Sequence, residues 1–219
     1  MRNSRIISTT GGDRPFGEGA ARRGDVIYVT AEDSAAQTIR PRLEAAGSNL
    51  QRVHIIECVN DHFGPRPFSL VADLAQLEHA LQALRRPRLV IIDPINACLS
   101  ATGLRPFNPN SVPRVRALLR RLEELAGRYR VAIVCVTHFT KGKGAALFRV
   151  TGSFAFVAAA RSEFMVTRNQ DDPDQRLLAP LKKNFAVNDH AVAFRIKLHL
   201  RPATFLAPYV EFVSPSRAI

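Results

Sequence analysis

Short apolar runs alternate with amphipathic segments along the first two thirds of the chain, and this alternation predicts the architecture. Four of the runs are rich in β-branched residues and have the length of a buried strand. They lie at 25–30, 53–57, 88–93 and 131–136. Because helical segments separate them, we expect parallel strands joined by crossovers. The predicted fold class is therefore α/β, with helices flanking a mostly parallel sheet.

The segments that follow the first two strands carry signals for a helix and a loop. After the first strand, Asp33 or Ser34 can cap a helix that ends at Gly47. Pro41 lies inside this helix and predicts a kink or a break there, because proline lacks a backbone donor. The stretch 58–69 contains a glycine and two of the chain's prolines and is predicted to be a loop.

Two longer helices are predicted in front of the third and fourth strands. A leucine stripe begins directly after Ser69 and has helical spacing. The second helix begins at Ser111, with a proline in its first turn. A loop rich in proline and asparagine, 97–112, separates this helix from the third strand.

Beyond residue 150 the pattern becomes that of antiparallel strands. A short apolar helix at 152–162 runs into a strand at 163–168, and the turn residues NQDDPDQ lead to further strand-like runs. No linker separates this part from the rest. We therefore expect one domain over 1–219, with a loop or tail at 1–24 and an antiparallel extension at 150–219.

Composition narrows the class of protein and its partners. Apolar residues make up 46% of the chain and charged residues 23%, which is typical of a folded core. No apolar run approaches the roughly 20 residues of a membrane span, and no signal-peptide core is present. The three cysteines form no C-x-x-C pair, which favours the reducing cytoplasm. The net charge of +12 favours a polyanionic partner such as nucleic acid over a merely soluble basic protein.

Three polar side chains follow apolar strands, at the edge where parallel sheets carry their chemistry. Asp93 ends the third strand, where a carboxylate can hold the water shell of Mg²⁺. Glu32 follows the first strand and could orient or deprotonate an attacking water. His138 follows the fourth and could bond a phosphate. Structural alternatives are a loop-capping aspartate, an acid favoured by a helix dipole and a hydrogen-bonded histidine.

Two basic features come later in the chain. Arg161 follows a run of alanines, and its guanidinium could stabilise a transferring phosphoryl group across a subunit boundary or form a surface salt bridge. The loop 139–153 is rich in glycine and carries Lys141, Lys143 and Arg149. These three side chains could contact a nucleic-acid backbone.

Taken in order, these segments resemble the RecA-like ATPases, and within them the RepA-like hexameric replicative helicases. The resemblance covers roughly residues 20–190 and rests on VIYVTAED, RLVIIDP, VTHFTKGKG, GSFAFVAAARS and LKKN. It implies a RecA-like fold, ATP and Mg²⁺ as cofactors, DNA as a partner and a homo-oligomeric ring such as a hexamer.

The resemblance also implies roles for single residues. Lys182 or Lys183 falls where related ATPases place a second basic residue near the phosphates, and the loop 139–151 matches the DNA-facing loop of the ring. The remaining roles are the catalytic glutamate for Glu32, the Walker B aspartate for Asp93, the γ-phosphate sensor for His138 and the arginine finger for Arg161.

The chain departs from this family at its start. The family begins with a strand, a phosphate-binding loop and a helix, whereas RIISTTGGDRPFG resembles only the end of that helix and the loop beyond it. The pattern G-x-x-x-x-G-K-[ST] occurs nowhere in the 219 residues. Without that cradle, tight ATP binding should fail, and without the strand the sheet has an unpaired edge. We expect an inactive, truncated core, through a misplaced start codon, a decayed or interrupted gene, or a strand supplied by another chain.

Two other functions are compatible with the sequence. The charge and the missing phosphate loop also suit a non-catalytic nucleic-acid-binding or ring-assembly module. An α/β enzyme with another substrate is the third interpretation, although no G-x-S-x-G, G-x-G-x-x-G or cysteine–histidine signature supports it.

Overall fold

The structure is a computed structural model that describes residues 22–99, 107–139, 155–183, 190–200 and 206–213. Contacts divide the described residues into two compact units, which are treated separately below. The first unit comprises those within 23–39 and 51–159, and the second comprises Arg22 and those within 40–50 and 160–219.

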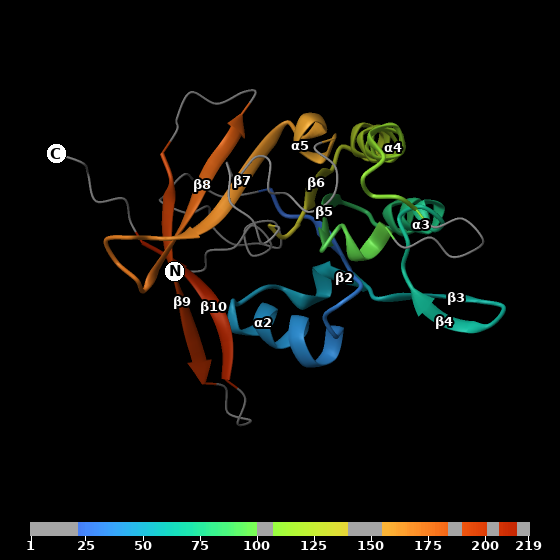
Figure 1. The fold of residues 1–219 in the computed structure, drawn as a ribbon. Coiled ribbons are helices and arrows are strands. Elements are labelled where there is room, and N and C mark those ends of the chain that lie inside the picture. Colours follow the sequence, from blue (N-terminus) through green and yellow to red (C-terminus); the bar gives the residue numbers. More distant parts are fainter. Residues whose placement is uncertain (1–21, 100–106, 140–154, 184–189, 201–205, 214–219) are drawn as a thin grey trace. The chain divides into compact units, whose positions relative to one another are not determined.

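The first unit is built on a parallel sheet. Its four strands are β1 (Asp25–Thr30), β2 (Val53–Ile56), β5 (Pro87–Asp93) and β6 (Ala132–Cys135), in the order β2-β1-β5-β6 (Figure 1). Each neighbouring pair is parallel. All four strands fall where the apolar runs predicted them, which confirms the α/β class.

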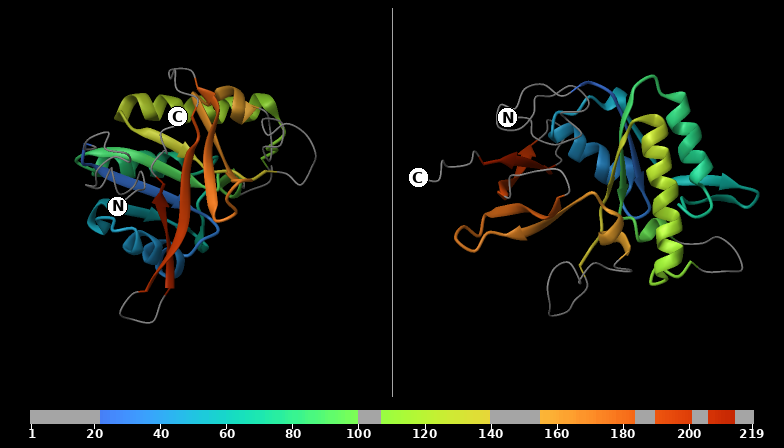
Figure 2. Two further views of the ribbon diagram at one scale, coloured as in Figure 1. Left: turned by 90° about the vertical axis from the view of Figure 1, so that its left-hand side faces the viewer. Right: turned by 90° about the horizontal axis from the view of Figure 1, so that it is seen from above.

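Two helices cover one face of this sheet. α3 (Leu74–Ala83) and α4 (Val112–Tyr129) lie side by side on it (Figure 2), and the short α5 (Ala155–Ala159) packs against α4. Ile27, Val29, Val90 and Ile92 of the sheet cluster with the buried leucines of both helices and are at most 1% exposed. Burying each such side chain contributes about 1.5–3 kcal/mol, so this layer is the main core of the unit.

The loop predicted at 58–69 is wrong, because the structure forms a hairpin there. β3 (Cys58–Asp61) and β4 (Gly64–Pro67) pair with each other and with no other strand among the described residues (Figure 1). Proline is tolerated on such an edge because its missing N–H breaks no further ladder. The Arg66 guanidinium donates two hydrogen bonds of 2.7 Å to the buried Asp73 carboxylate and one of 2.8 Å to Asp61.

The start of α3 also differs from the prediction, whereas the start of α4 is confirmed. The helix begins at Leu74 with Asp73 as its cap residue, because the Ser69 hydroxyl accepts local bonds from Val71 and Ala72 in a preceding turn. The Asp73 carboxylate accepts the Ser69 N–H at 2.9 Å. Ser111 occupies the N-cap position of α4, as the sequence predicts, although its side chain makes no capping hydrogen bond.

The segment after β1 is helical but irregular. A π-helical turn, Ala35–Ile39, precedes α2 (Arg40–Ala45), so the regularity changes next to Pro41 as predicted. Gly47 has a φ of +76°, and two backbone bonds, from Gly47 to Glu44 and from Ser48 to Leu43, close the helix end. Short 3₁₀ turns occur at Leu50–Arg52 and Ala97–Leu99.

The second unit is an antiparallel sheet. Its strands are β7 (Ser162–Arg168), β8 (Gln175–Lys183), β9 (Val192–Leu200) and β10 (Leu206–Phe212), in the order β10-β9-β8-β7. The register puts one set of apolar residues on a single face. Five of them, Phe164, Val166, Ile196, Leu198 and Leu206, are 41–64% exposed. The antiparallel extension is thus confirmed and leaves apolar surface uncovered.

No helix among the described residues is long and apolar enough to cross a membrane.

Candidate nucleotide site

The topology of the parallel sheet creates a switch point between β1 and β5. From β1 the chain crosses to β2 at one edge, and it then returns to β5 on the other side of β1. Open α/β sheets bind ligands beyond the carboxyl ends of the strands at such a point, because the connections diverge there and leave a crevice. Glu32 and Asp93 lie at these two strand ends.

Asp93 ends β5, and Glu32 follows the neighbouring strand β1 at the same edge of the sheet. Thr30 is the register partner of Asp93, and Glu32 follows two residues later, in an exposed turn. The Cys98 side chain is fully buried beside them. Burial, together with the smaller effects of the negative charges of Asp93 and Glu32, raises the pKa of the Cys98 thiol to about 11. The register therefore places the two acidic residues that the sequence singled out at the ends of adjacent strands.

The Asp93 carboxylate is held by a tyrosine from the neighbouring strand. The Tyr28 hydroxyl donates a hydrogen bond of 2.5 Å to Asp93 Oδ2. Tyr28 and Thr30 lie on one face of β1, opposite Ile91 and Asp93 of β5. This is the face opposite to the one that α3 and α4 cover, because the alternate residues Ile27 and Val29 belong to the helix-covered core.

The turn that carries Glu32 is fixed from two sides. The Thr30 side chain is 1% exposed, and its hydroxyl accepts the Asp33 N–H at 3.2 Å. Glu57, directly after β2, accepts the backbone N–H of Ala35 at the start of the π-helical turn. These bonds fix the backbone on either side of the Glu32 turn.

His138 follows the strand next to β5. Backbone bonds tie the residue after β6 to β5 and to the loop after it, from Ile95 N–H to Val136 O at 2.8 Å and from Val136 N–H to Ile92 O at 2.9 Å. Asn96 adds a side-chain bond of 2.9 Å from Nδ2 to the Thr137 hydroxyl. The exposed His138 comes next in the chain. Glu32, Asp93 and His138 therefore follow the carboxyl ends of three adjacent strands.

The predicted basic residues belong to the second unit or lie outside the described residues. Arg161 is exposed and directly precedes β7, and Lys182 lies opposite Glu163 in the β7–β8 pair, so both belong to the second unit. Partial burial raises the pKa of the Glu163 carboxyl, and the charge of Lys182 opposes this shift. Lys183 ends β8. Lys141, Lys143 and Arg149 lie outside the described residues.

A magnesium ion fits the donor set at the switch point. Within the described ranges, no three His, Cys, Asp or Glu side chains gather into a metal cage. Mg²⁺ needs none, because it keeps several waters and is bound through one or two carboxylates together with substrate phosphates. The half-buried Asp93 carboxylate is a hard oxygen donor of this kind.

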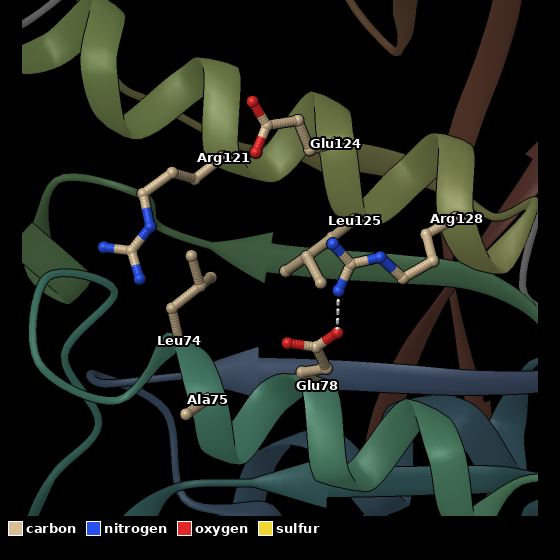
Figure 3. A pocket seen from close by; sticks show the side chains of 7 residues that line it. All are labelled: Leu74, Ala75, Glu78, Arg121, Glu124, Leu125 and Arg128. Carbon is tan, nitrogen blue, oxygen red and sulfur yellow. Dashed lines mark hydrogen bonds and ion pairs between the residues drawn. The ribbon is translucent and has the colours of Figure 1, made fainter.

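A cavity of about 180 Å³ lies away from these residues, between α3 and α4. Figure 3 shows its lining, in which Arg128 pairs with Glu78 across the two helices beside Leu74 and Leu125. The Arg128 guanidinium and the Tyr129 hydroxyl lower the pKa of the Glu78 carboxyl, the hydroxyl having the larger effect. None of the residues at the switch point lines this cavity, so we interpret it as part of the helix–helix contact.

Sequence reasoning missed three residues that hold the site in place. Tyr28, Asn96 and Glu57 bond the strand ends or the loops next to them. Tyr28 could have been found from the sequence, because its hydroxyl is a polar group within a mostly apolar strand. Asn96 and Glu57 carry none, because their partners are 41 and 22 residues away in the chain.

Comparisons with known proteins agree with this architecture. Residues 5–144 match the model of a family described as AAA domain, AAA_25. The fold is similar to a solved structure whose title describes an ATPase domain, with 10% identity, a TM-score of 0.56, and coverage of 78% of this chain and 71% of that one. A structure of the RadB recombinase is similar at 13% identity and a TM-score of 0.52, with 80% and 76% covered. No curated protein sequence matches the chain.

Proposed function

The chain belongs to the AAA domain family and has a RecA-like ATPase fold, and from this premise we propose that it is the core of an ATP-dependent motor that acts on DNA. One observation supports the proposal. Thr30, two residues before Glu32, is the register partner of Asp93 at the switch point of the parallel sheet, where RecA-like chemistry needs an acid–metal pair.

We assign each residue at the switch point one task. Asp93 holds Mg²⁺ through the metal's water shell, and the ion, when bound, neutralises charge on the phosphate oxygens. Glu32 orients the attacking water and accepts its proton, for which an exposed carboxylate beside the metal-holding strand is suited. His138, at the neighbouring strand end, bonds the terminal phosphate.

The residues of this chain supply only part of a nucleotide site. The G-x-x-x-x-G-K-[ST] pattern, whose backbone amides and lysine cradle the phosphates, is absent from its sequence. We therefore expect the chain by itself to bind Mg²⁺–ATP weakly and to hydrolyse it slowly or not at all.

The DNA-directed and ring-forming parts of the proposal depend on charge. A net charge of +12 favours a phosphate backbone as the partner, and Lys141, Lys143 and Arg149 are the proposed contacts. Arg161 is assigned to the site of a neighbouring subunit, and Lys182 or Lys183 to the phosphates. We place this activity in the cytoplasm, which the absence of a cysteine pair with disulfide or metal spacing favours.

Nucleotide binding tests the core of the proposal. Binding of Mg²⁺–ATP is measured up to millimolar concentrations for the wild-type chain, Asp93→Asn and, as a matched control, Asp171→Asn in the exposed β7–β8 turn. We expect weak binding that Asp93→Asn abolishes and Asp171→Asn leaves unchanged. Any turnover should fall by about 10² or more in Glu32→Gln. Equal binding by the wild type and Asp93→Asn would contradict the proposal.

A non-catalytic nucleic-acid-binding module is the second candidate, because the same charge occurs without a phosphate loop. Both candidates predict DNA binding that weakens steeply with salt, and Lys141→Ala or Lys143→Ala should reduce the salt slope by about 1. They differ in the effect of nucleotide. DNA affinity that Mg²⁺–ATP leaves unchanged favours the module, and affinity that Mg²⁺–ATP alters in an Asp93-dependent way favours the motor.

A further inference from the structure

The Asp93 carboxylate has one hydrogen-bond partner among the described residues, the hydroxyl of Tyr28. The two oxygens are 2.5 Å apart, which is within the range of a hydroxyl that donates to a carboxylate. Tyr28 lies two residues before Thr30, the register partner of Asp93, so the phenol extends along the sheet face to the strand end. Both side chains are half-buried.

The bond engages Oδ2 and leaves Oδ1 without a hydrogen-bond partner among the residues that the structure describes. A carboxylate on a strand end can rotate about its side-chain bonds, and rotation moves the oxygen that a metal's water shell would meet. Outer-shell hydrogen bonds fix the orientation of such ligands in metal sites. We propose that Tyr28 is a positioning residue for Asp93, holding Oδ2 so that Oδ1 is presented to Mg²⁺. This inference rests on the metal-holding role that the proposed function gives Asp93.

A second hydrogen bond between a tyrosine hydroxyl and a carboxylate occurs in the same unit, where it has a structural role. The Tyr129 hydroxyl donates to Glu78 Oε1 at 3.0 Å and accepts from Gln82 at 3.0 Å, and Arg128 also pairs with Glu78. That carboxylate is held by several partners at a helix–helix contact. Asp93, in contrast, depends on Tyr28 alone among the described residues. Tyr129→Phe is therefore a matched control for Tyr28→Phe.

The first test asks whether the bond forms in solution, and it needs no metal or nucleotide. The urea midpoints of unfolding are compared for the wild type, Tyr28→Phe, Asp93→Ala and the double variant. If the hydroxyl bonds Asp93, Tyr28→Phe lowers the midpoint in the wild type and lowers it much less in the Asp93→Ala background. Additive shifts would show that the bond is absent and would overturn the inference, whatever the function of the site.

The second test asks whether the orientation of the Asp93 carboxylate affects the binding of a metal–nucleotide complex. Mn²⁺–ATP is titrated into the full chain to millimolar concentrations, and binding is followed by water-proton relaxation, a readout separate from turnover. We expect Tyr28→Phe to weaken binding about 10-fold and Tyr129→Phe to leave it unchanged. If Tyr28→Phe binds Mn²⁺–ATP as tightly as the wild type while Asp93→Ala loses binding, the inference about Tyr28 is overturned and the role of Asp93 is not. Equal binding by Asp93→Ala and the wild type, or none by either, would overturn the role of Asp93 as well.

Discussion

The two sheets of this protein differ in how far the apolar side chains of their strands are covered. In the parallel sheet, β5 is apolar on both faces, and Val90 and Ile92 are fully buried. In the antiparallel sheet, Ile196 and Leu198 of β9 remain 56% and 64% exposed. Parallel strands need long crossovers, which here contain α3 and α4, whereas antiparallel strands can be joined by a short turn, such as the one between β7 and β8, that adds no helix.

The two sheets therefore differ in which residues they hold rigidly and which they leave exposed. The covered sheet fixes Glu32, Asp93 and the loop before His138 at its carboxyl edge by bonds between neighbouring strands. The antiparallel sheet carries Arg161 and Lys182 and keeps an apolar face. We therefore expect substitutions in the parallel unit to cost folding stability and equivalent substitutions on the antiparallel face to leave it nearly unchanged.

The largest predicted effect is the loss of folding stability caused by a cavity between α3 and the parallel sheet. Leu77 on α3 is fully buried, so Leu77→Ala should lower the free energy of unfolding by about 2–5 kcal/mol, through lost contacts and an unfilled space. Leu198→Ala is the paired variant and should stay within about 0.5 kcal/mol of the wild type. Chemical denaturation measures both. Similar losses in the two variants would show that the antiparallel face is covered in solution.

The next effect is expected at the ion pair that anchors the hairpin. Asp73→Asn removes a 3% exposed carboxylate and leaves Arg66 without its main partner, which should cost about 3 kcal/mol. Asp61→Asn, at the more exposed partner of the same guanidinium, should cost less. Urea unfolding at neutral pH ranks the two variants, and a larger loss in Asp61→Asn would contradict this assignment.

The same pair predicts a pH dependence. The Arg66 hydrogen bonds hold the pKa of Asp73 below its ordinary value of 3.8 in the folded chain. The unfolded chain thus binds the proton more readily, so the stabilisation is complete above about pH 5 and is lost as the pH falls through the folded pKa. Unfolding free energies measured between pH 6 and pH 3 should converge for the wild type and Asp73→Asn.

A smaller effect is predicted for an ion pair of the antiparallel sheet. Arg195 donates to Asp172 at 2.6 Å, but both side chains are about 30% exposed. Arg195→Gln should therefore cost about 0.5 kcal/mol, and the loss should shrink at high salt, because water and counterions screen the pair. A loss that salt does not change would mean that the pair is shielded from solvent in the folded chain.

The smallest effect is expected at the cap of α4. Ser111 has the backbone position of an N-cap, but its side chain makes no capping hydrogen bond. Ser111→Ala should therefore fall short of the usual cost of about 1 kcal/mol and leave the melting temperature nearly unchanged. A full loss would show that the hydroxyl caps the helix in solution.

Local patterns predicted most of the elements. The four parallel strands, the antiparallel extension, the Ser111 cap and the end at Gly47 all depend on neighbouring residues, and each was predicted from them. The hairpin at 58–67 was not, because its prolines and glycine indicate a loop. What stabilises the hairpin is the bond between Arg66 and Asp73, a residue that the sequence assigns to the next helix.

Local sequence was enough to single out the candidate acids and the histidine, because each directly follows an apolar strand and parallel strands end at one edge. The folded arrangement was needed to establish that β1 and β5 are neighbours, that Thr30 pairs with Asp93, and that the Tyr28 hydroxyl bonds the Asp93 carboxylate. The reason is that the pairing of β1 with β5 and the Tyr28–Asp93 bond join residues that are 60 or more positions apart, about which the local pattern carries no information.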